Sequence, residues 1–279
     1  MSGSALGHIW ASRNGRFGLV AVALVVLVAL AAPWIVTYPP NQLDIANRFA
    51  PPSLAHWLAT AHVGRDLCSR IVFGTRIAVE VSLGVTALSL AIGTMLGIVA
   101  AYAPRQGERA ILVVFDVINS FPSLILALAC VAALGASFTN IILLVTVAFV
   151  PQFGRVARAQ TLVLKSSPFL EAERVLGAGP LRVALTHVLP NIIGPLAVLA
   201  SMNVPSVITI EAGLSFLGVG VQPPLASWGS LLHDGYTYLD QSVWPVVVSG
   251  AALTLATLGF TLFGEALRDA IDPKMRRAP

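Results

Sequence analysis

Long apolar runs are the feature that most constrains how this chain can fold. The clearest covers residues 17–36, and comparable runs recur along the sequence. A membrane-spanning helix needs about 20 mainly apolar residues, because the hydrocarbon core of a bilayer is about 30 Å thick. Only 11% of the 279 residues are charged and 56% are hydrophobic, whereas about a quarter of a soluble domain is usually charged. We therefore predict an all-α integral membrane protein.

The apolar runs predict six transmembrane helices. They cover residues 17–36, 77–102, 110–134, 138–150 with an extension toward Arg155, 192–210 and 243–263. The third run is interrupted by Asp116, Asn119 and Pro122. The second contains small residues that let helices approach closely, and these are Gly84, Gly93 and Gly97.

The first run has two interpretations. Arg13 and Arg16 precede it, and Ala29-Leu30-Ala31 has the small-residue pattern of a signal-peptide cleavage site. However, the run is long for the apolar region of a signal peptide, and the rest of the chain is also rich in membrane-spanning runs. We expect a retained first helix, with a cleaved signal peptide as the alternative.

The distribution of positive charge predicts the orientation in the membrane. Six spans place both termini on one side. With the N-terminus inside, 13 of the 17 Lys and Arg residues fall in inner segments, and the four outer ones are Arg48, Arg65, Arg70 and Arg76. Cytoplasmic loops carry such an excess. We therefore predict cytoplasmic termini, and the net charge of +4 needs no nucleic-acid partner.

Three long loops are expected between these spans. Residues 37–76 and 214–242 lie outside in this topology, and residues 154–189 lie inside. Loops of this length often carry function.

No motif of an enzyme or of a metal site occurs in the sequence. There is no HExxH motif, and the run Gly213–Leu217 is not GxSxG because it ends in leucine. Cys68 and Cys130 are far apart and the five histidines are scattered, so we predict no metal site or disulfide framework. Neither Lys165 nor Lys274 belongs to a GxxxxGK[ST] phosphate loop. We therefore predict no catalytic residue on this chain.

The inner loop predicts one short, isolated helix. Ser167 can cap its start, Pro168 suits its first position, and Gly177 suits the left-handed position after its end. A helix of about nine residues is marginal in water unless it docks on something. The side chains available for apolar contact are Phe169, Leu170, Val175 and Leu176. From the residues alone, a partner protein and the inner membrane surface are equally good docking surfaces.

The same loop resembles the EAA loop of the permease subunits of ABC importers. The pattern reads Glu171-Ala172-x4-Gly177-x9-His187-Val188-Leu189-Pro190. In that family the loop forms a coupling helix that sits in a groove of the cytoplasmic ATPase. Glu173 departs from the family pattern, which usually has a second alanine there. The resemblance implies ATPase-coupling residues at Pro168, Phe169, Leu170, Glu171, Ala172, Glu173, Arg174, Leu176, Gly177, His187, Leu189 and Pro190.

Further motifs resemble the dipeptide, oligopeptide and nickel branch of these permeases, in particular the second of its two permease types. They are Gly64-Arg65-Asp66-Leu67-Cys68-Ser69-Arg70, residues 187–191, residues 211–220, Pro224, Trp228-Gly229 and residues 267–273. The usual GTD before the first motif is replaced by Ala59-Thr60-Ala61. The match runs from about residue 60 to the C-terminus, and we predict one permease domain over residues 1–279. Residues 1–76 form its first span and outer loop, and residues 77–279 form a five-helix core.

The resemblance implies that the chain is a subunit of an ATP-driven importer in the cytoplasmic membrane. This importer would translocate di- or oligopeptides. The implied partners are a different permease, two cytoplasmic ABC ATPase subunits and an extracytoplasmic substrate-binding protein. ATP and Mg²⁺ bind the ATPase partner, and this chain carries no cofactor. Nickel chelates, glutathione and haem-like ligands also fit the branch. An ATP-independent secondary transporter is the alternative from another class, although no internal repeat is evident.

Four polar residues in the expected spans are candidates for the translocation pathway. They are Asp116, Asn119, Asn203 and Glu211. Acidic residues within a membrane are costly and usually face protein or water. A structural role is the alternative for two of them. Asp116 can pair with Arg155 or Arg158, and Glu211 can stabilise packing near the outer surface.

Overall fold

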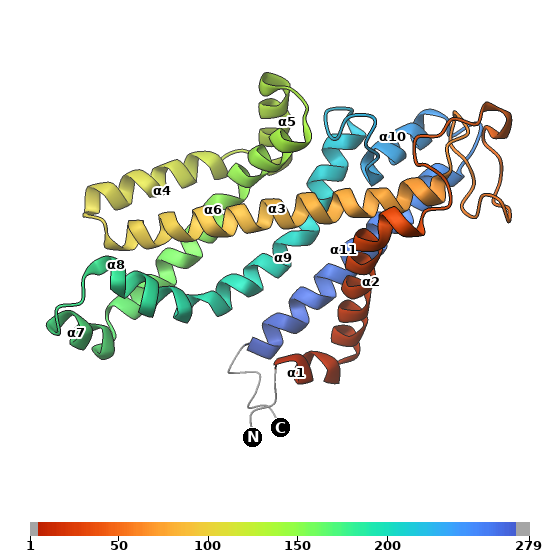
Figure 1. Ribbon diagram of the computed structural model, residues 1–279. Helices are drawn as coiled ribbons and strands as arrows, with labels where there is room; N and C mark the ends of the chain where they lie inside the picture. Colours follow the sequence, from red (N-terminus) through yellow and green to blue (C-terminus); the bar gives the residue numbers. More distant parts are fainter. Residues whose placement is uncertain (1–4, 272–279) are drawn as a thin grey trace.

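The computed structural model describes residues 5–271, except the side chains of Ala5, Leu6, His8 and Arg174. Within that range all regular elements are helical, apart from an isolated bridge between Thr60 and Asp66. This confirms the predicted all-α class (Figure 1). The helices that are long and apolar enough to cross a membrane are α2 (Arg13–Ile35), α3 (Leu67–Tyr102), α6 (Phe138–Lys165), α9 (Leu189–Phe216) with the segment before it, and α11 (Trp244–Ile271).

The expected third span is broken into two helices. α4 (Arg105–Asn119) and α5 (Ser123–Leu134) meet at an angle of 89°. The break falls at Pro122, which cannot donate a backbone hydrogen bond and disfavours helix in the residue before it. The 12 residues of α5 extend only about 18 Å. Residues 5–271 therefore contain five helices that could span a membrane, or six if this bent pair crosses it as one.

Glycines allow α3 and α6 to pack closely. A β-carbon added at Gly93 would lie 2.6 Å from the carbonyl oxygen of Val150, and one at Gly97 would lie 2.3 Å from that of Gly154. At Gly84 the nearest atom would be 3.6 Å away, which is an ordinary contact. The predicted close approach is thus confirmed at two of the three glycines.

An ion pair and an aromatic ring join α4 to the same side of α6. Glu108 of α4 accepts a hydrogen bond from Nε of Arg158, at 2.8 Å. Nearby, Phe115 is buried against Gly154, where an added β-carbon would lie 2.4 Å from the ring. The first half of the broken span is therefore attached to the α3–α6 pair.

The first long helix is also part of the packed body. α2 lies along α11, where a β-carbon at Gly18 would meet the backbone nitrogen of Phe263 at 2.4 Å. One at Gly259 would meet the side chain of Ala21 at 2.6 Å. The short helix α1 (Ala5–Ala11) packs beside the end of α11. Residues 13–35 thus have the close helix contacts expected of a retained first span.

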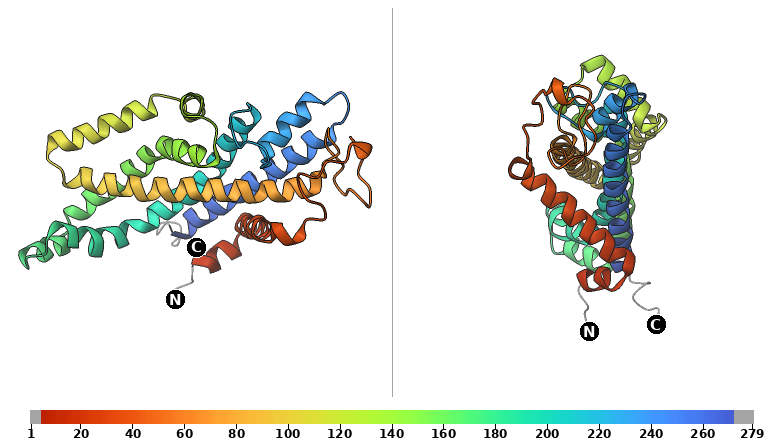
Figure 2. Two further views of the ribbon diagram at one scale, coloured as in Figure 1. Left: turned by 45° about the horizontal axis from the view of Figure 1, so that its top comes forward. Right: turned by 90° about the vertical axis from the view of Figure 1, so that its right-hand side faces the viewer.

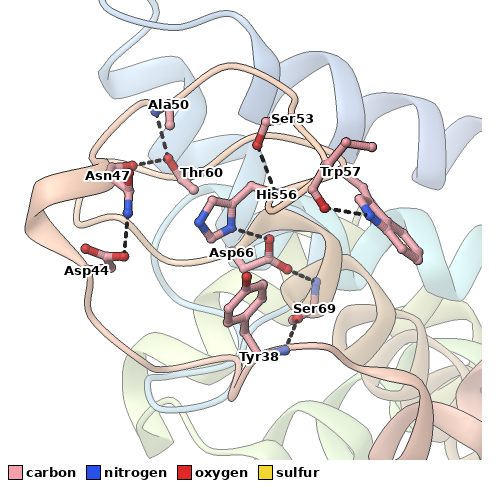
Figure 3. A network of polar contacts seen from close by, with 11 residues as sticks. Tyr38, Asp44, Asn47, Ala50, Ser53, His56, Trp57, Thr60, Asp66 and Ser69 are labelled. Carbon is pink, nitrogen blue, oxygen red and sulfur yellow. Dashed lines mark hydrogen bonds and ion pairs between the residues drawn. The ribbon is translucent and has the colours of Figure 1, made fainter.

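Residues 36–66 form a cap over the start of α3 (Figure 3). The carboxylate of Asp66 accepts a hydrogen bond from the backbone N–H of Ser69 at 2.8 Å, which makes it the N-cap of α3. Its other oxygen lies 3.0 Å from Nδ1 of His56. The N–H of Tyr38 donates to the hydroxyl of Ser69 at 3.3 Å. The cap and the helix start are therefore tied by buried polar contacts.

The backbone of the cap explains two of the sequence motifs. Gly64 has a left-handed φ of +74°, and a β-carbon there would lie 1.6 Å from the carbonyl oxygen of Asp44, next to the short turn η1 (Ile45–Asn47). The hydroxyl of Thr60 donates to the carbonyl oxygen of Asn47 at 2.5 Å and accepts from the N–H of Ala50 at 2.8 Å. The motif that begins at Gly64 and the segment Ala59-Thr60-Ala61 therefore both stabilise the fold of the cap.

The loops gather at two opposite ends of the molecule. In both Figure 1 and the left view of Figure 2, the cap and α10 (Trp228–Thr237) lie at one end. α7 (Pro168–Val175) and α8 (Pro180–Val183) lie at the other. The inner loop is shorter than expected, because α6 continues to Lys165. The separation agrees with loops on two sides of a membrane, and the orientation itself stays a prediction.

Candidate functional site

α7 and the turn after it form the segment that was predicted as a coupling helix. Pro168 begins the helix as expected, and Gly177 follows its end with a left-handed φ of +84°. The N–H of Ala178 donates to the carbonyl oxygen of Glu173 at 3.0 Å, which closes the helix end. A β-carbon at Gly177 would meet no atom within 4 Å. Glycine is therefore favoured here by the backbone angle and not by a lack of space for a side chain.

The expected capping role of Ser167 is wrong. Its hydroxyl donates to the carbonyl oxygen of Leu164 in α6, at 2.5 Å. The last carbonyl groups of a helix lack partners within that helix, and α6 ends at Lys165. Ser167 therefore satisfies the end of α6, and its side chain is not directed at the start of α7.

The apolar side chains of this segment divide into two groups. Leu170 is fully buried in a cluster that includes Phe153 of α6 and residues of α9. Phe169, Val175 and Leu176 are 45%, 86% and 81% exposed. Leu170 thus fixes the helix on its own chain, and the other three leave an apolar surface uncovered. We call Phe169, Val175 and Leu176 the α7 face.

Glu173 has a partner in the same chain. Its Oε2 atom lies 3.6 Å from Nε2 of His187, and each side chain is about a third exposed. The ring of Phe169 stands edge-on to the imidazole, with centroids 6.4 Å apart. The contacts join α7 to the segment that leads into α9. Motif spacing identified both Glu173 and His187, but it carried no signal that the two side chains meet.

The remaining predicted coupling residues differ in their settings. Glu171 and Ala172 are exposed on α7, and Leu189 is half-buried. The side chain of Arg174 lies outside the described part of the chain. The ATPase contact of this residue set stays a prediction.

Pro190 does not interrupt the helical span in which it lies. α8, the π-helical segment η2 (Ala184–Val188) and α9 run as one span over residues 180–216. The N–H of Leu189 donates to the carbonyl oxygen of Ala184, five residues earlier. Pro190 has no N–H of its own and lies in the first turn of α9. The wider π turn before it accommodates this missing donor without ending the helix.

One of the pathway candidates, Asn119, lines a hollow of about 480 Å³ between α4, α5 and α6. Asn119 lines the hollow together with Gln152 and Arg155. Asp116 pairs with Arg155 at 2.5 Å, and both side chains are exposed. Asp116 therefore makes the ion pair with Arg155 that was the structural alternative to a role in the translocation pathway. The Arg155 partner of this pair lines the hollow.

The other two candidates lie inside the helical body. Asn203 and Glu211 of α9 are 5% and 1% exposed. Glu211 accepts a hydrogen bond from the hydroxyl of Ser215 at 2.7 Å, and that hydroxyl accepts from the N–H of Val221 at 3.0 Å. Glu211 thus holds the turn after α9, which favours its structural alternative. A pathway role for Asn203 and Glu211 stays a prediction.

Residues 93–277 match the family described as the binding-protein-dependent transport system inner membrane component. The chain belongs to this family. Residues 10–52 of the permease also match the N-terminal transmembrane domain of oligopeptide transport permease C. The permease is therefore a multi-pass component of the inner membrane, and its first long helix lies in the part that matches this N-terminal domain.

Relatives of the permease have names that refer to peptides. It is 38% identical to a putative peptide transport system permease protein from Brucella suis, over 95% of this chain and 89% of that one. It is 37% identical to the probable D,D-dipeptide transport system permease protein DdpC from Escherichia coli, over 91% and 86% of the two chains. The glutathione transport system permease protein GsiD from another Escherichia coli strain is also 37% identical, over 91% and 84%.

The fold of the permease is that of a solved transporter. Inward-facing structures of the MetNI methionine ABC transporter include a chain that aligns with a TM-score of 0.59 and 17% identity. The alignment covers 72% of the permease and 96% of that chain. At this identity the likeness concerns the fold alone.

Proposed function

We propose that this permease is one of two different membrane subunits of an ATP-driven importer for di- or oligopeptides. The observation that carries the coupling part is the α7 face, because large apolar side chains at the end of a membrane protein need a cover. A groove on a cytoplasmic ATPase provides that cover. The peptide part is supported by the names of the relatives from Brucella suis and Escherichia coli.

In this proposal the energy comes from ATP, which two separate ATPase subunits bind together with Mg²⁺ and hydrolyse. The permease has no phosphate loop and contributes the docking helix. ATP binding closes the ATPase pair and displaces α7, and the spans then move between inward- and outward-facing states. Nucleotide shifts this equilibrium because the ATPases bind it more tightly in one state than in the other. An extracytoplasmic binding protein delivers the substrate.

The proposed topology has six spans with both termini in the cytoplasm. The bent pair α4–α5 then counts as one broken span. The 13 inner cations support this orientation, as does the separation of α7 and α8 from the cap (Figure 1).

The second permease is proposed to cover the hollow beside α4, α5 and α6. Asn119, Gln152 and Arg155 line it, and polar side chains at membrane depth usually face protein or water. Phe121 also lines the hollow and is exposed, and an exposed apolar side chain there suits a helix–helix contact. Asp116 and Asn119 then lie where the two permeases enclose the pathway.

Reconstitution tests the proposal. Proteoliposomes that contain both permeases, the ATPases and the binding protein should accumulate a labelled dipeptide only when ATP is supplied. Competition with glutathione and with a nickel chelate then separates the substrates, and glutathione is the second candidate because of the relative GsiD. Uptake that needs no ATP would identify a secondary transporter and refute the proposal.

A further inference from the structure

An apolar groove of about 540 Å³ lies between the second half of α3 and the segment that leads into α9. Met95 and Ile98 line it from α3, and Leu181, Leu185 and Ile193 line it from the opposite side. Both walls belong to helices that are apolar enough to cross a membrane. The groove is therefore open to the lipid phase and not only to water.

Polar groups lie along this groove without partners. The hydroxyls of Thr94 and Tyr102 are buried and have no hydrogen-bond partner among the described residues, and both residues line the groove. Thr94 is only 6% exposed. A buried hydroxyl that lacks a hydrogen bond is costly. Both hydroxyls are closed off from solvent, so the open surface of the groove is almost wholly apolar and suits a hydrocarbon chain.

A positive charge stands at the Tyr102 end of the groove. The ammonium group of Lys165 lies 5.1 Å from the centre of the Tyr102 ring. It donates one hydrogen bond, to the carbonyl oxygen of Ala101 at 3.0 Å. An ammonium group has three donors, so Lys165 keeps capacity for an anion.

We propose that the groove binds one acyl chain of an anionic phospholipid, with the headgroup phosphate held by Lys165. The apolar walls suit the chain, and the lysine complements the charge of the phosphate. In the proposed orientation this lipid comes from the cytoplasmic leaflet, where basic residues attract anionic lipids. Because one wall is the segment before α9, the lipid would also support the region that holds α7.

Native mass spectrometry of the chain, purified with its transporter partners, tests the site. After delipidation, we expect phosphatidylglycerol to bind more tightly than phosphatidylcholine. Lys165→Met should reduce this preference about fivefold, because one lysine near a membrane surface contributes about 1 kcal/mol. Arg109→Met is the matched control: Arg109 is exposed on α4, is not among the residues lining the groove, and should leave the preference unchanged.

Filling the groove tests the acyl-chain contact. Ala184→Phe should abolish binding of both lipids, and Ala91→Phe on the facing helix should do the same if the first variant proves unstable. A photoreactive residue at position 185 should label lipid. Labelling of the second permease instead would show that the groove is a subunit interface and would overturn the proposal. Equal binding of the two lipids to the unmodified complex would also overturn it.

Discussion

Gly177 and Gly179 stand two positions apart in equally open surroundings, yet only Gly177 has a left-handed backbone. An added β-carbon would meet no atom within 4 Å at either position. The φ of Gly177 is +84°, and that of Gly179 is −70°. The pair therefore separates the effect of backbone angle from the effect of space at the end of α7.

Gly177→Ala should loosen the end of α7 and weaken coupling. A β-carbon in the left-handed region costs about 1–2 kcal/mol, and the closing bond between Ala178 and Glu173 depends on this angle. The measurements are ATPase co-purification and substrate-stimulated ATP hydrolysis. Gly179→Ala is the control and should retain both. Equal behaviour of the two variants would show that the left-handed turn does not matter for coupling.

The contact between Glu173 and His187 should make a small but measurable contribution. Partly exposed ion pairs are usually worth about 0–1 kcal/mol, and the two atoms are 3.6 Å apart. A double-mutant cycle with Glu173→Ala and His187→Ala, read by thermal unfolding, should give a coupling energy of about 0.2–1 kcal/mol. The same cycle with exposed Glu171 in place of Glu173 should give none. Additive effects of the two substitutions in the first cycle would show that the contact does not contribute to stability.

Packing of α3 on α6 should depend on Gly93 and Gly97 and not on Gly84. Gly97→Val forces a side chain against the backbone of Gly154, and such overpacking typically costs about 1–3 kcal/mol. We expect a lower melting temperature of the purified complex. Gly84→Ala should have little effect, because its nearest neighbour would be 3.6 Å away. An equal loss of stability at position 84 would contradict this account of the interface.

Cysteine labelling should place α7 and the cap on opposite sides of the membrane. Leu54 is 97% exposed in the cap, and Glu171 is exposed on α7. In a background without Cys68 and Cys130, an impermeant maleimide added to intact cells should label Leu54→Cys and not Glu171→Cys. Permeabilised cells should show labelling at both sites. The reverse pattern in intact cells would invert the proposed topology.

The sequence was sufficient for the elements that depend on local rules. Apolar runs located the five long helices, although not their ends. Pro168 and Gly177 located α7, because proline favours the start of a helix and glycine the left-handed residue after it. The spacing of the motif in the inner loop indicated the family of the chain.

Features that depend on contacts between distant residues were not predictable from the sequence. The 89° angle between α4 and α5 depends on how both helices pack, and a proline alone does not set it. Ser167 bonds back to α6 because that helix ends two residues earlier, at Lys165. The meeting of Glu173 with His187 follows from the placement of α7 beside the span that leads into α9.

The continuity of α6, which runs on past Pro151, gives the permease a long lever. Its 28 residues extend about 42 Å, and α7 begins three residues after its last one, Lys165. The glycine contacts fasten α3 along this rod, and the pairs Glu108–Arg158 and Asp116–Arg155 fasten α4. A displacement of α7 should therefore move α3, α4 and α6 together as one rigid body. Residues 120–122 form the hinge at which α5 can move separately from them.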